Sequence, residues 1–317
     1  MNNPGWLPAL RSLGYLRALM PRPSSVTHVW DLPGEKRPRF TQGGSVASVV
    51  RLLGDTTGLT RMGVTLRVID PGAAGTHRHF HMVEEEWAYV VSGRGTVRIG
   101  PHRLPVRAGS FAGFPPGPRP HHFLADAGER IVLLEGGERR PREDYGWYVD
   151  AGRMWRAGKF IEPAEPLPGP EEGSPEQCVQ VDDLATYEFR HDVDATARRT
   201  MRELHKRTGL TRQAVYWSRV EPGERSTAFH RHERTDEWIF VLAGRGRARV
   251  GDDRFEIGQF DFLAHPAGGA AHVMEAIEPL LYLMGGEIDP SDVVVYPDAG
   301  VRRTVRGIES RPDQKPG

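Results

Sequence analysis

Six histidines and two glutamates recur along the chain at spacings that suit metal ligation. Two histidines separated by one residue precede a glutamate by four residues and a glycine by six more, and this pattern occurs twice. Histidines at i and i+2 of a strand point to the same face, so both imidazoles can enter a barrel together. A third histidine follows each pattern after a Pro-x-Gly turn. The predicted ligand sets are His79, His81, Glu86 and His121 in the first half, and His230, His232, Glu237 and His272 in the second.

Three imidazoles and one carboxylate are ligands that suit iron, manganese, nickel, copper, cobalt or zinc, and not calcium or magnesium. Four protein ligands on a metal that prefers six leave two positions for water, dioxygen or a chelating substrate. We therefore expect one divalent transition metal in each half of the chain. Iron(II) is favoured, with manganese, nickel, zinc and copper as alternatives, and the sequence does not identify catalytic residues.

The two patterns belong to an internal duplication. Residues 57–121 align without a gap with residues 208–272, and 24 of the 65 aligned positions are identical, whereas unrelated segments would agree at about one position in fifteen. The alignment also selects among the histidines, because the second copy has no histidine opposite His77 or His122. We expect His77 at the rim of the site and His122 on the opposite face of its strand.

The duplicated unit must be a β-structure, since short apolar runs punctuated by glycine and proline predict an all-β barrel or sandwich. A leucine at every third position from 7 to 19 predicts a short amino-terminal helix, and residue preferences predict another over about 195–206. The proline-rich stretch 162–175 is the expected connector. The predicted organisation is an amino-terminal extension (1–43), a first domain (44–155), a linker (156–180), a second domain (181–305) and a polar tail (306–317).

Composition excludes several classes of protein. Lysine plus arginine number 42, as do aspartate plus glutamate, and the sequence pI is near 7.3, so no basic field favours nucleic acid. The single cysteine, Cys178, excludes an intrachain disulfide framework. No stretch approaches the ~20 apolar residues of a membrane span. We expect a cytoplasmic protein whose partner is a small-molecule substrate, with no nucleic acid and no membrane; the sequence leaves homo-oligomer formation open.

The spacing Gly-x6-His-x-His-x4-Glu-x6-Gly, followed by Pro-x-Gly-x3-His, resembles the two motifs of the cupin superfamily, and two copies resemble a bicupin. The resemblance implies two tandem jelly-roll barrels (double-stranded β-helices) with few short helices, one metal in each, held by the eight residues above. The run Glu86–Val90 is similar to oxalate decarboxylases, which use manganese, whereas other bicupins are ring-opening dioxygenases. The chain departs from oxalate decarboxylases, which have three residues between the histidine pair and the glutamate. Each unit ends in a repeated closing string, Tyr148–Gly152 or Tyr296–Gly300. The closing segments Gly-Gly-Glu and Asp292–Asp298 also resemble uncharacterised bacterial cupin-domain proteins.

Three functions are consistent with these features, and an enzyme is favoured. The first is an iron(II) oxygenase, a dioxygenase above all, acting on a small organic acid or on an aromatic or enolic molecule that chelates the metal. The second is a redox-neutral lyase or isomerase that resembles oxalate decarboxylase. The third is a non-catalytic bicupin that binds a small molecule, because fold alone does not decide function.

Side chains near the predicted ligands carry further expectations. Arg98 and Arg249 either bind an anionic substrate or form surface salt bridges. Asp261 or His265 would add an acid or base to the second barrel if directed inward. Glu84 and Glu85 are expected to be solvated loop residues. Five aromatic residues either line an apolar pocket or pack the barrels: Trp87, Tyr89, Trp217, Trp238 and Phe240.

Overall fold

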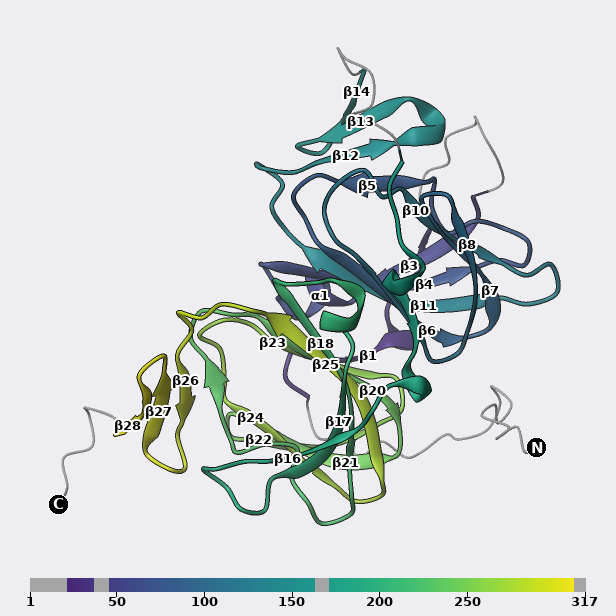
Figure 1. Ribbon diagram of the computed structural model, residues 1–317. Helices are drawn as coiled ribbons and strands as arrows, with labels where there is room; N and C mark the ends of the chain where they lie inside the picture. Colours follow the sequence, from purple (N-terminus) through teal and green to yellow (C-terminus); the bar gives the residue numbers. More distant parts are fainter. Residues whose placement is uncertain (1–21, 37–45, 163–170, 311–317) are drawn as a thin grey trace.

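β-Strands form nearly all of the regular structure, and they assemble into two barrels (Figure 1). The computed structural model describes residues 22–36, 46–162 and 171–310. In Figure 1 the first barrel is blue and teal, and the second is green and yellow. The predicted all-β fold with two barrels is therefore confirmed.

The first barrel consists of two seven-stranded antiparallel sheets, with strand orders β15-β9-β6-β11-β4-β3-β2 and β14-β13-β12-β5-β10-β7-β8. The first sheet lies toward the second barrel, and the other sheet completes the first barrel (Figure 1). The strands are β2 (Glu35–Lys36), β3 (Ser48–Leu52), β4 (Met62–Ile69), β5 (His79–His81), β6 (Glu86–Ser92), β7 (Arg94–Ile99), β8 (His102–Arg107), β9 (Ser110–Phe114), β10 (His121–Ala125), β11 (Ile131–Glu138), β12 (Tyr145–Tyr148), β13 (Arg153–Arg156), β14 (Lys159–Ile161) and β15 (Cys178–Gln180).

The second barrel repeats this plan with a seven-stranded sheet, β1-β23-β20-β25-β18-β17-β16, opposed by sheets β22-β21-β24 and β19-β26-β27-β28. Its strands are β1 (Val26–His28), β16 (Tyr187–Arg190), β17 (Arg198–Glu203), β18 (Gln213–Val220), β19 (Arg231–His232), β20 (Glu237–Ala243), β21 (Arg245–Val250), β22 (Asp253–Gly258), β23 (Asp261–His265), β24 (His272–Ala276), β25 (Leu280–Glu287), β26 (Val294–Tyr296), β27 (Val301–Thr304) and β28 (Gly307–Ser310). The helices described are short: η1 (Val29–Asp31), α1 (Leu53–Thr57), η2 (Val149–Ala151), η3 (Pro175–Gln177), η4 (Val181–Asp183) and η5 (Lys206–Thr208).

The helix predicted over 195–206 is wrong, because the middle half of this segment, Arg198–Glu203, forms strand β17. β17 pairs with β16 on one side and with β18 on the other. Hydrogen bonds to two neighbouring strands outweigh the few tenths of a kcal/mol by which residue preferences favour a helix. The predicted amino-terminal helix lies outside the described residues. Within the described part of the chain, no helix has the length and apolar character that crossing a membrane requires.

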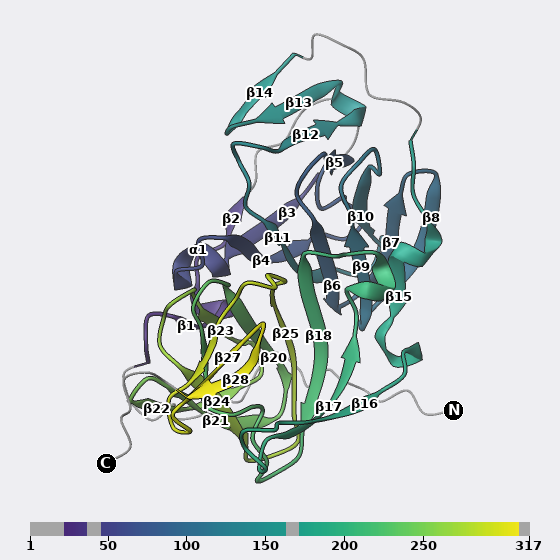
Figure 2. The ribbon, with the colours of Figure 1, turned by 60° about the vertical axis from the view of Figure 1, so that its left-hand side comes forward.

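Each barrel lends one strand to the sheet of the other. Strand β1 precedes the first barrel but pairs with β23 of the second, with His28 opposite Asp261. Strand β15 precedes the second barrel but pairs with β9 of the first, with Gln180 opposite Ser110. The two partner positions, 110 and 261, differ by the repeat displacement, so the exchange is reciprocal. Figure 2 shows both exchanged strands in place, where each covers an otherwise free sheet edge.

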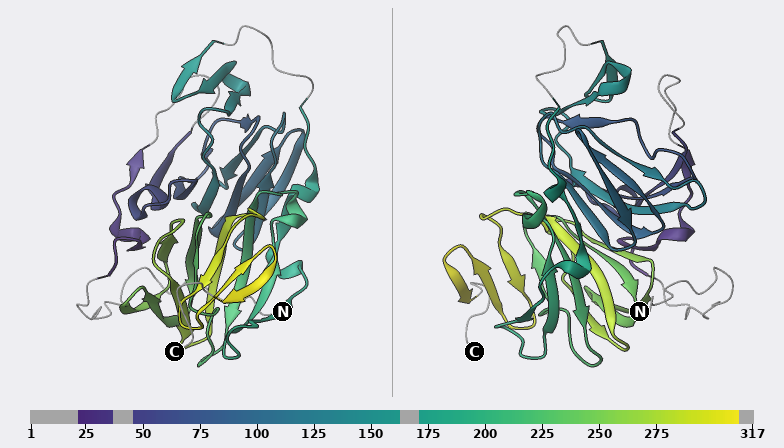
Figure 3. Two further views of the ribbon diagram at one scale, coloured as in Figure 1. Left: turned by 90° about the vertical axis from the view of Figure 1, so that its left-hand side faces the viewer. Right: turned by 45° about the vertical axis from the view of Figure 1, so that its right-hand side comes forward.

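One apolar core contains side chains of both barrels, whose sheets lie against each other in both views of Figure 3. Side chains alternate along a strand, so Trp87 follows Glu86 on β6 with the opposite orientation, and Trp238 follows Glu237 on β20 in the same way. The two indole rings stack with centroids 4.8 Å apart. Packing, rather than a pocket, therefore explains most of the aromatic residues considered above. The remaining ones also belong to this core or pack against it: Tyr89, Phe240 and Trp217.

Two buried carboxylates fasten the barrels together in a reciprocal way. Glu85 of the first barrel is 1 % exposed and accepts hydrogen bonds from the backbone N–H groups of residues 211–213 of the second. Asp236, its repeat partner, is also 1 % exposed and accepts from the N–H groups of residues 60 and 61 of the first. The prediction that Glu85 is solvated is therefore wrong. Its neighbour Glu84 is also partly buried and accepts from the backbone N–H of Arg140.

The glycine that ends each ligand pattern has a steric role. Gly93 and Gly244 have φ angles of 90° and 84°, which side-chain-bearing residues rarely adopt. A Cβ atom at Gly93 would lie 1.9 Å from the carbonyl oxygen of Arg130, and one at Gly244 would lie 2.0 Å from that of Pro279. Both glycines therefore allow the chain to turn closely against the residue that precedes strand β11 or β25.

Candidate metal centres

The four predicted ligands of the first barrel converge on one carboxylate oxygen. His79 and His81 lie on β5, Glu86 begins β6 and His121 begins β10, directly opposite His79. The Nε2 atoms of His79, His81 and His121 lie 3.6, 3.6 and 3.3 Å from Glu86 Oε2. The sequence thus places all four residues correctly in one cluster, although three separate strands contribute them.

The second barrel reproduces this cluster. The Nε2 atoms of His230, His232 and His272 lie 3.5, 3.5 and 3.2 Å from Glu237 Oε2. His230 forms an isolated antiparallel bridge with His272, as His79 does with His121. Corresponding distances in the two barrels differ by no more than 0.1 Å, so the two clusters have the same shape.

The outward nitrogens of the paired histidines are held by fixed acceptors. His79 Nδ1 donates to the backbone carbonyl of His77 at 2.9 Å, and His230 Nδ1 donates to that of Ala228 at 2.9 Å. Because a carbonyl can only accept, Nδ1 of each ring carries the proton. The neutral ring then presents the lone pair of Nε2 to the interior, as metal ligation requires.

Two aspartates hold the second histidine of each pair, and sequence reasoning missed both. His81 Nδ1 donates to Asp144 Oδ2 at 2.5 Å, and His232 Nδ1 donates to Asp292 Oδ2 at 2.6 Å. The other oxygen of each aspartate accepts a backbone N–H from the loop before the glutamate ligand. A signal was present, because these aspartates lie four residues before Tyr148 and Tyr296 in the repeated closing strings.

The electrostatics of each cluster favour a bound cation. Burial alone would raise the pKa of Glu86, but the three imidazoles outweigh it and hold that pKa below the usual range. Burial, aided by repulsion from His121, lowers the pKa of His79 to about 3. Burial also opposes a charge on His81, yet Glu86 and Asp144 outweigh it and raise the pKa of His81 to about 9. Without a metal, the first cluster would take up a proton on His81.

One atom in each cluster shows that a metal fits. Glu86 Oε2 and Glu237 Oε2 are buried and have no hydrogen-bond partner among the described residues. A buried carboxylate oxygen without a partner is costly, and a cation between it and three imidazole nitrogens would remove that cost. The ligand atoms of each His-x-His pair and its glutamate lie within 4.8 Å of one another, so each group can hold a metal ion.

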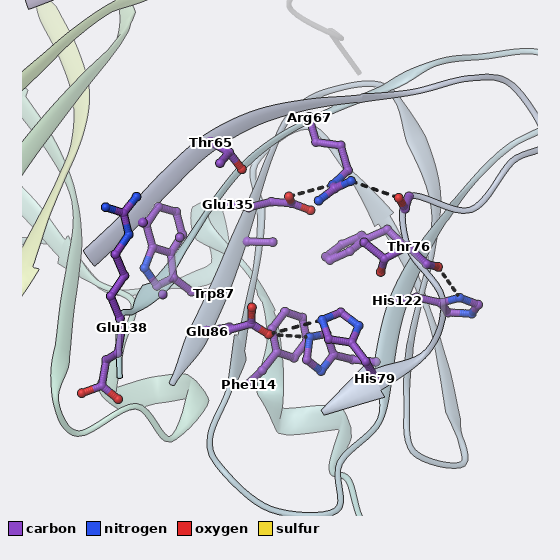
Figure 4. A pocket seen from close by; sticks show the side chains of 18 residues that line it. Thr65, Arg67, Thr76, His79, Glu86, Trp87, Phe114, His122, Glu135 and Glu138 are labelled. Atoms are coloured by element: carbon purple, nitrogen blue, oxygen red, sulfur yellow. Dashed lines mark hydrogen bonds and ion pairs between the residues drawn. The ribbon is translucent and has the colours of Figure 1, made fainter. Parts of the chain in front are cut away.

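Each cluster opens into a cavity. The first has a volume of about 320 Å³, and Figure 4 shows Arg67, paired with Glu135, across it from His79 and Glu86. Trp87 borders this cavity on one side as well as stacking on Trp238. The second cavity has a volume of about 420 Å³. Both volumes suit a small organic molecule.

Aromatic rings clamp the ligand histidines. Phe114 stacks on His121 with centroids 3.6 Å apart, and His265 stacks on His272 at 3.4 Å in the second barrel. Burial, with repulsion from His272, holds the pKa of His265 well below its usual value. His265 therefore lies beside the cluster as a neutral, stacked ring. Asp261 does not face the cluster, because it binds Arg22 and His28 of the exchanged strand segment.

Other residues considered from the sequence have structural contacts. His77 is buried, at 5 % exposure, and its backbone carbonyl orients His79, while its place at the rim of the site stays a prediction. His122 turns away from Glu86 in Figure 4 and contacts the carbonyl of Thr76. The salt-bridge alternative fits Arg249, which contacts Asp298 at 2.7 Å. Arg98 lies 4.0 Å from Glu171.

Comparison with known proteins agrees with this geometry. A family model described as the cupin domain matches residues 65–136 and 216–284. Oxalate decarboxylase from Bacillus subtilis has a similar structure, with a TM-score of 0.54, 18 % sequence identity, and coverage of 82 % of this chain and 75 % of that chain. Protein Ylba from E. coli has a TM-score of 0.56 at 13 % identity, covering 83 % of this chain and 90 % of that chain. No curated protein sequence matches significantly.

At these identities the structural likeness concerns the fold. Each cupin-domain match begins on β4 or β18 and includes the His-x-His pair, the glutamate and the third histidine of one barrel. The matches, the two clusters and the two-barrel fold agree: the chain contains two cupin domains, one in each barrel.

Proposed function

We propose that each barrel binds one divalent transition metal and that the protein is a metal-dependent enzyme acting on a small molecule. The ligands would be the eight residues of the two clusters. The observation that carries this proposal is the buried, unpartnered carboxylate oxygen faced by three Nε2 atoms, present in both barrels. When bound, the metal would supply Lewis acidity and open positions for substrate or dioxygen.

The chain's own residues would prepare the site in three ways. Asp144 and Asp292 fix the ring orientation of a ligand histidine and hold a proton on its outward nitrogen Nδ1, so that Nε2 is the atom that a metal would bind. The stacked Phe114 and His265 hold the third histidine and exclude water from one side of it. The cavity walls then determine which molecule reaches the metal.

The first reaction that we propose is an oxygenation with iron(II). Three neutral imidazoles and one carboxylate suit this ion, and two open positions would admit dioxygen beside a chelating substrate. The substrate class is a small organic acid, or an aromatic or enolic molecule. This proposal predicts that the iron-loaded protein consumes dioxygen with at least one member of a panel of catechols, gentisate, diketones and flavonols.

A redox-neutral reaction is the second candidate, and the charged cavity walls favour it. Arginine side chains line both cavities, and an arginine there that is not already paired with a carboxylate would bind an anionic substrate for a lyase or isomerase. The Bacillus subtilis oxalate decarboxylase, which shares the fold, has Mn(II) centres, so manganese is the metal to test first for this reaction. Turnover of oxalate or a related acid in the absence of dioxygen would establish this class and exclude the first.

Elemental analysis of protein purified without added metal tests the common basis of both candidates. We expect up to two transition-metal ions per chain, and dialysis against a chelator followed by reloading should restore the same ratio. A protein that retains no transition metal and binds none on reloading would refute the proposed function.

A further inference from the structure

Both barrels hold one guanidinium at the same place, but they supply it from different strands. In the first barrel, Arg67 of β4 donates Nη1 to the backbone carbonyl of Gly75 at 3.1 Å. In the second, Arg199 of β17 donates Nη1 to the carbonyl of Ser226. Gly75 and Ser226 are equivalent positions of the repeat. The two side chains therefore reach one site from neighbouring strands.

The repeat shows that the two residue types have been exchanged. Ser48 and Arg199 occupy equivalent positions, because each lies four residues before the cross-strand partner of the equivalent Thr65 or Tyr216. The position of Arg67 is occupied in the second barrel by Ser218. Arg67 also donates to Ser48 Oγ at 3.0 Å. Each barrel thus keeps one arginine and one serine at this pair of positions, and a guanidinium beside the cavity is the feature that both retain.

The partner of this guanidinium differs between the barrels. Arg67 Nε donates to Glu135 Oε2 at 2.7 Å, so its charge is paired within the protein. The equivalent of Glu135 is Met284, because their cross-strand partners on β4 and β18, Thr65 and Tyr216, are themselves equivalent. Both Glu135 and Met284 line their cavities. The second cavity therefore lacks the carboxylate that neutralises the first guanidinium.

Arg199 is held in place without any carboxylate. Its Nε lies 3.0 Å from Met201 Sδ, and its guanidinium carbon lies 4.3 Å from the ring centroid of Phe189. No carboxylate of the described residues forms an ion pair with Arg199, whereas Arg303, at the same cavity, is paired with Asp192. A partly buried cation without a counter-charge can offer charge-assisted hydrogen bonds to an anion that enters.

The charges along the two cavities differ in the same direction. Two arginines and three glutamates line the first cavity, whereas three arginines, one aspartate and one glutamate line the second. A divalent metal would make both sites more positive by the same amount. The second cavity therefore attracts an anion more strongly than the first.

From this difference, we propose that the second cavity is the anion-binding site and that Arg199 binds a carboxylate of the substrate while another substrate oxygen reaches the metal. Glu135 shows that a carboxylate fits against a guanidinium at this place, since it fills the position in the first barrel. The ligand class is a small carboxylate-bearing chelator. The proposal rests on the proposed metal function, and it makes Arg199 the residue that determines specificity.

Binding of malonate to the full-length, manganese-loaded protein tests this proposal by calorimetry. We expect Arg199→Met to weaken malonate binding by about ten- to a hundredfold, because a charge-assisted contact is lost. Arg67→Met is the matched control and should leave the affinity unchanged. Neutral malonamide should bind equally weakly to both variants and to the unmodified protein. Equal losses in both arginine variants, or an unchanged affinity in Arg199→Met, would overturn the proposal.

Two substitutions, one that adds a carboxylate to the second cavity and one that removes a carboxylate from the first, test the same point while both arginines are kept. Met284→Glu gives Arg199 the partner that Arg67 has, and should reduce malonate affinity about as much as Arg199→Met. Glu135→Met frees Arg67 and should create a second malonate site. Retention of full malonate affinity in Met284→Glu, or preference of the unmodified protein for inorganic phosphate over malonate, would count against Arg199 as a carboxylate site.

Metal content measured on the same samples separates the two proposals. Two manganese ions per chain together with Arg199-independent malonate binding would refute only the role of Arg199. A chain that binds no manganese would refute the proposed function itself. Unfolding temperatures of all variants, compared with that of the unmodified protein, show whether a change in affinity reflects a folding defect.

Discussion

The two barrels have the same hydrogen-bond acceptors on the outward side of their candidate metal ligands, and they differ in the residues that line the cavities. In both barrels, Nδ1 of the second histidine of the pair donates to an aspartate, Asp144 or Asp292, and Nδ1 of the first histidine donates to a backbone carbonyl. In the cavity walls, Glu135 of the first barrel is replaced by Met284 in the second. Groups that fix the ligand atoms must keep their geometry, whereas cavity walls can change without disturbing the cluster.

The barrels also agree where they touch one another. The Trp87–Trp238 stack and the Glu85 and Asp236 contacts obey the same pseudo-twofold relation. The residues that line a cavity can therefore differ between the barrels, while the interface contacts and the acceptors of the histidine Nδ1 atoms keep the same geometry in both. The predictions below test how independent the two sites are.

Removal of one ligand should have the largest effect, and it should be confined to one barrel. His81→Ala and His232→Ala each remove an imidazole from a four-ligand set, so each is expected to reduce the metal content by one ion per chain. The double variant should bind none at the affinity of the unmodified protein. Elemental analysis after gel filtration measures this. If either single variant lost both ions, the two sites would be coupled and the comparison above would fail.

The interface carboxylates should contribute most to stability. Glu85→Ala leaves three backbone N–H groups and one hydroxyl of the second barrel without their acceptor, and we expect it to lower the free energy of unfolding by about 3–5 kcal/mol. Asp236→Ala should lower the free energy of unfolding somewhat less, because it leaves fewer hydrogen-bond donors without an acceptor. Chemical denaturation of metal-free protein measures both. Substitution of the exposed Glu129 by alanine is the control, with an expected change within about 0.5 kcal/mol; a similar small change in Glu85→Ala would contradict the proposed role.

Much of the fold and of the two candidate ligand clusters could be predicted because the sequence contains two copies of one unit that can be aligned with each other. Two copies at a constant displacement identify which of several neighbouring histidines share a face, and His79 and His81 were chosen over His77 in this way. Short apolar runs between glycines and prolines also sufficed to predict strands, since alternation along a strand is a local property. Neither inference requires knowledge of contacts between distant segments of the folded chain.

The features that could not be predicted depend on contacts between distant segments. Glu85 resembles a loop residue in the sequence, and only the approach of residues 211–213 makes it a buried acceptor. The strand exchange of β1 and β15 likewise depends on which barrel each segment meets. Helix preference over 195–206 failed for the same reason, because pairing with β16 and β18 is set by the tertiary fold.

The aspartates behind the ligands should have an intermediate effect on metal affinity. Asp144→Asn and Asp292→Asn retain the size of the side chain but remove the charge that orients the histidine, and such changes typically cost about 10- to 100-fold in affinity. We expect a similar loss in each barrel, because the two hydrogen bonds differ by 0.1 Å. Competition with a chelating dye measures the affinity, and Asp253→Asn, at an exposed position, is the control. A loss in only one barrel would show that the supports are not equivalent.

The smallest expected effect is a difference between the two exchanged strands, β1 and β15, in how their pairing responds to pH. Strand β15 is held to the first barrel by neutral groups, since Ser110 donates to Gln180 at 3.0 Å. Strand β1 is held to the second by Asp261, where burial would raise the carboxyl pKa but His28 and Arg22 outweigh it and lower that pKa. A carboxyl with a lowered folded-state pKa stabilises the protein above its unfolded value of about 3.9, and this contribution disappears as the pH falls through the folded pKa.

Acid should therefore loosen β1 before β15. Between pH 7 and pH 3 we expect the hydrogen-exchange protection of residues 26–28, corrected for the pH dependence of intrinsic exchange, to fall by a few fold more than that of residues 178–180, because about 1 kcal/mol of charge pairing is lost at only one of the two junctions. Asp261→Ser gives the second barrel the residue that the first has at this position, so it should abolish the difference in pH response. If residues 178–180 exchanged as fast as residues 26–28 at pH 3, the charge at Asp261 would not be what distinguishes the two junctions.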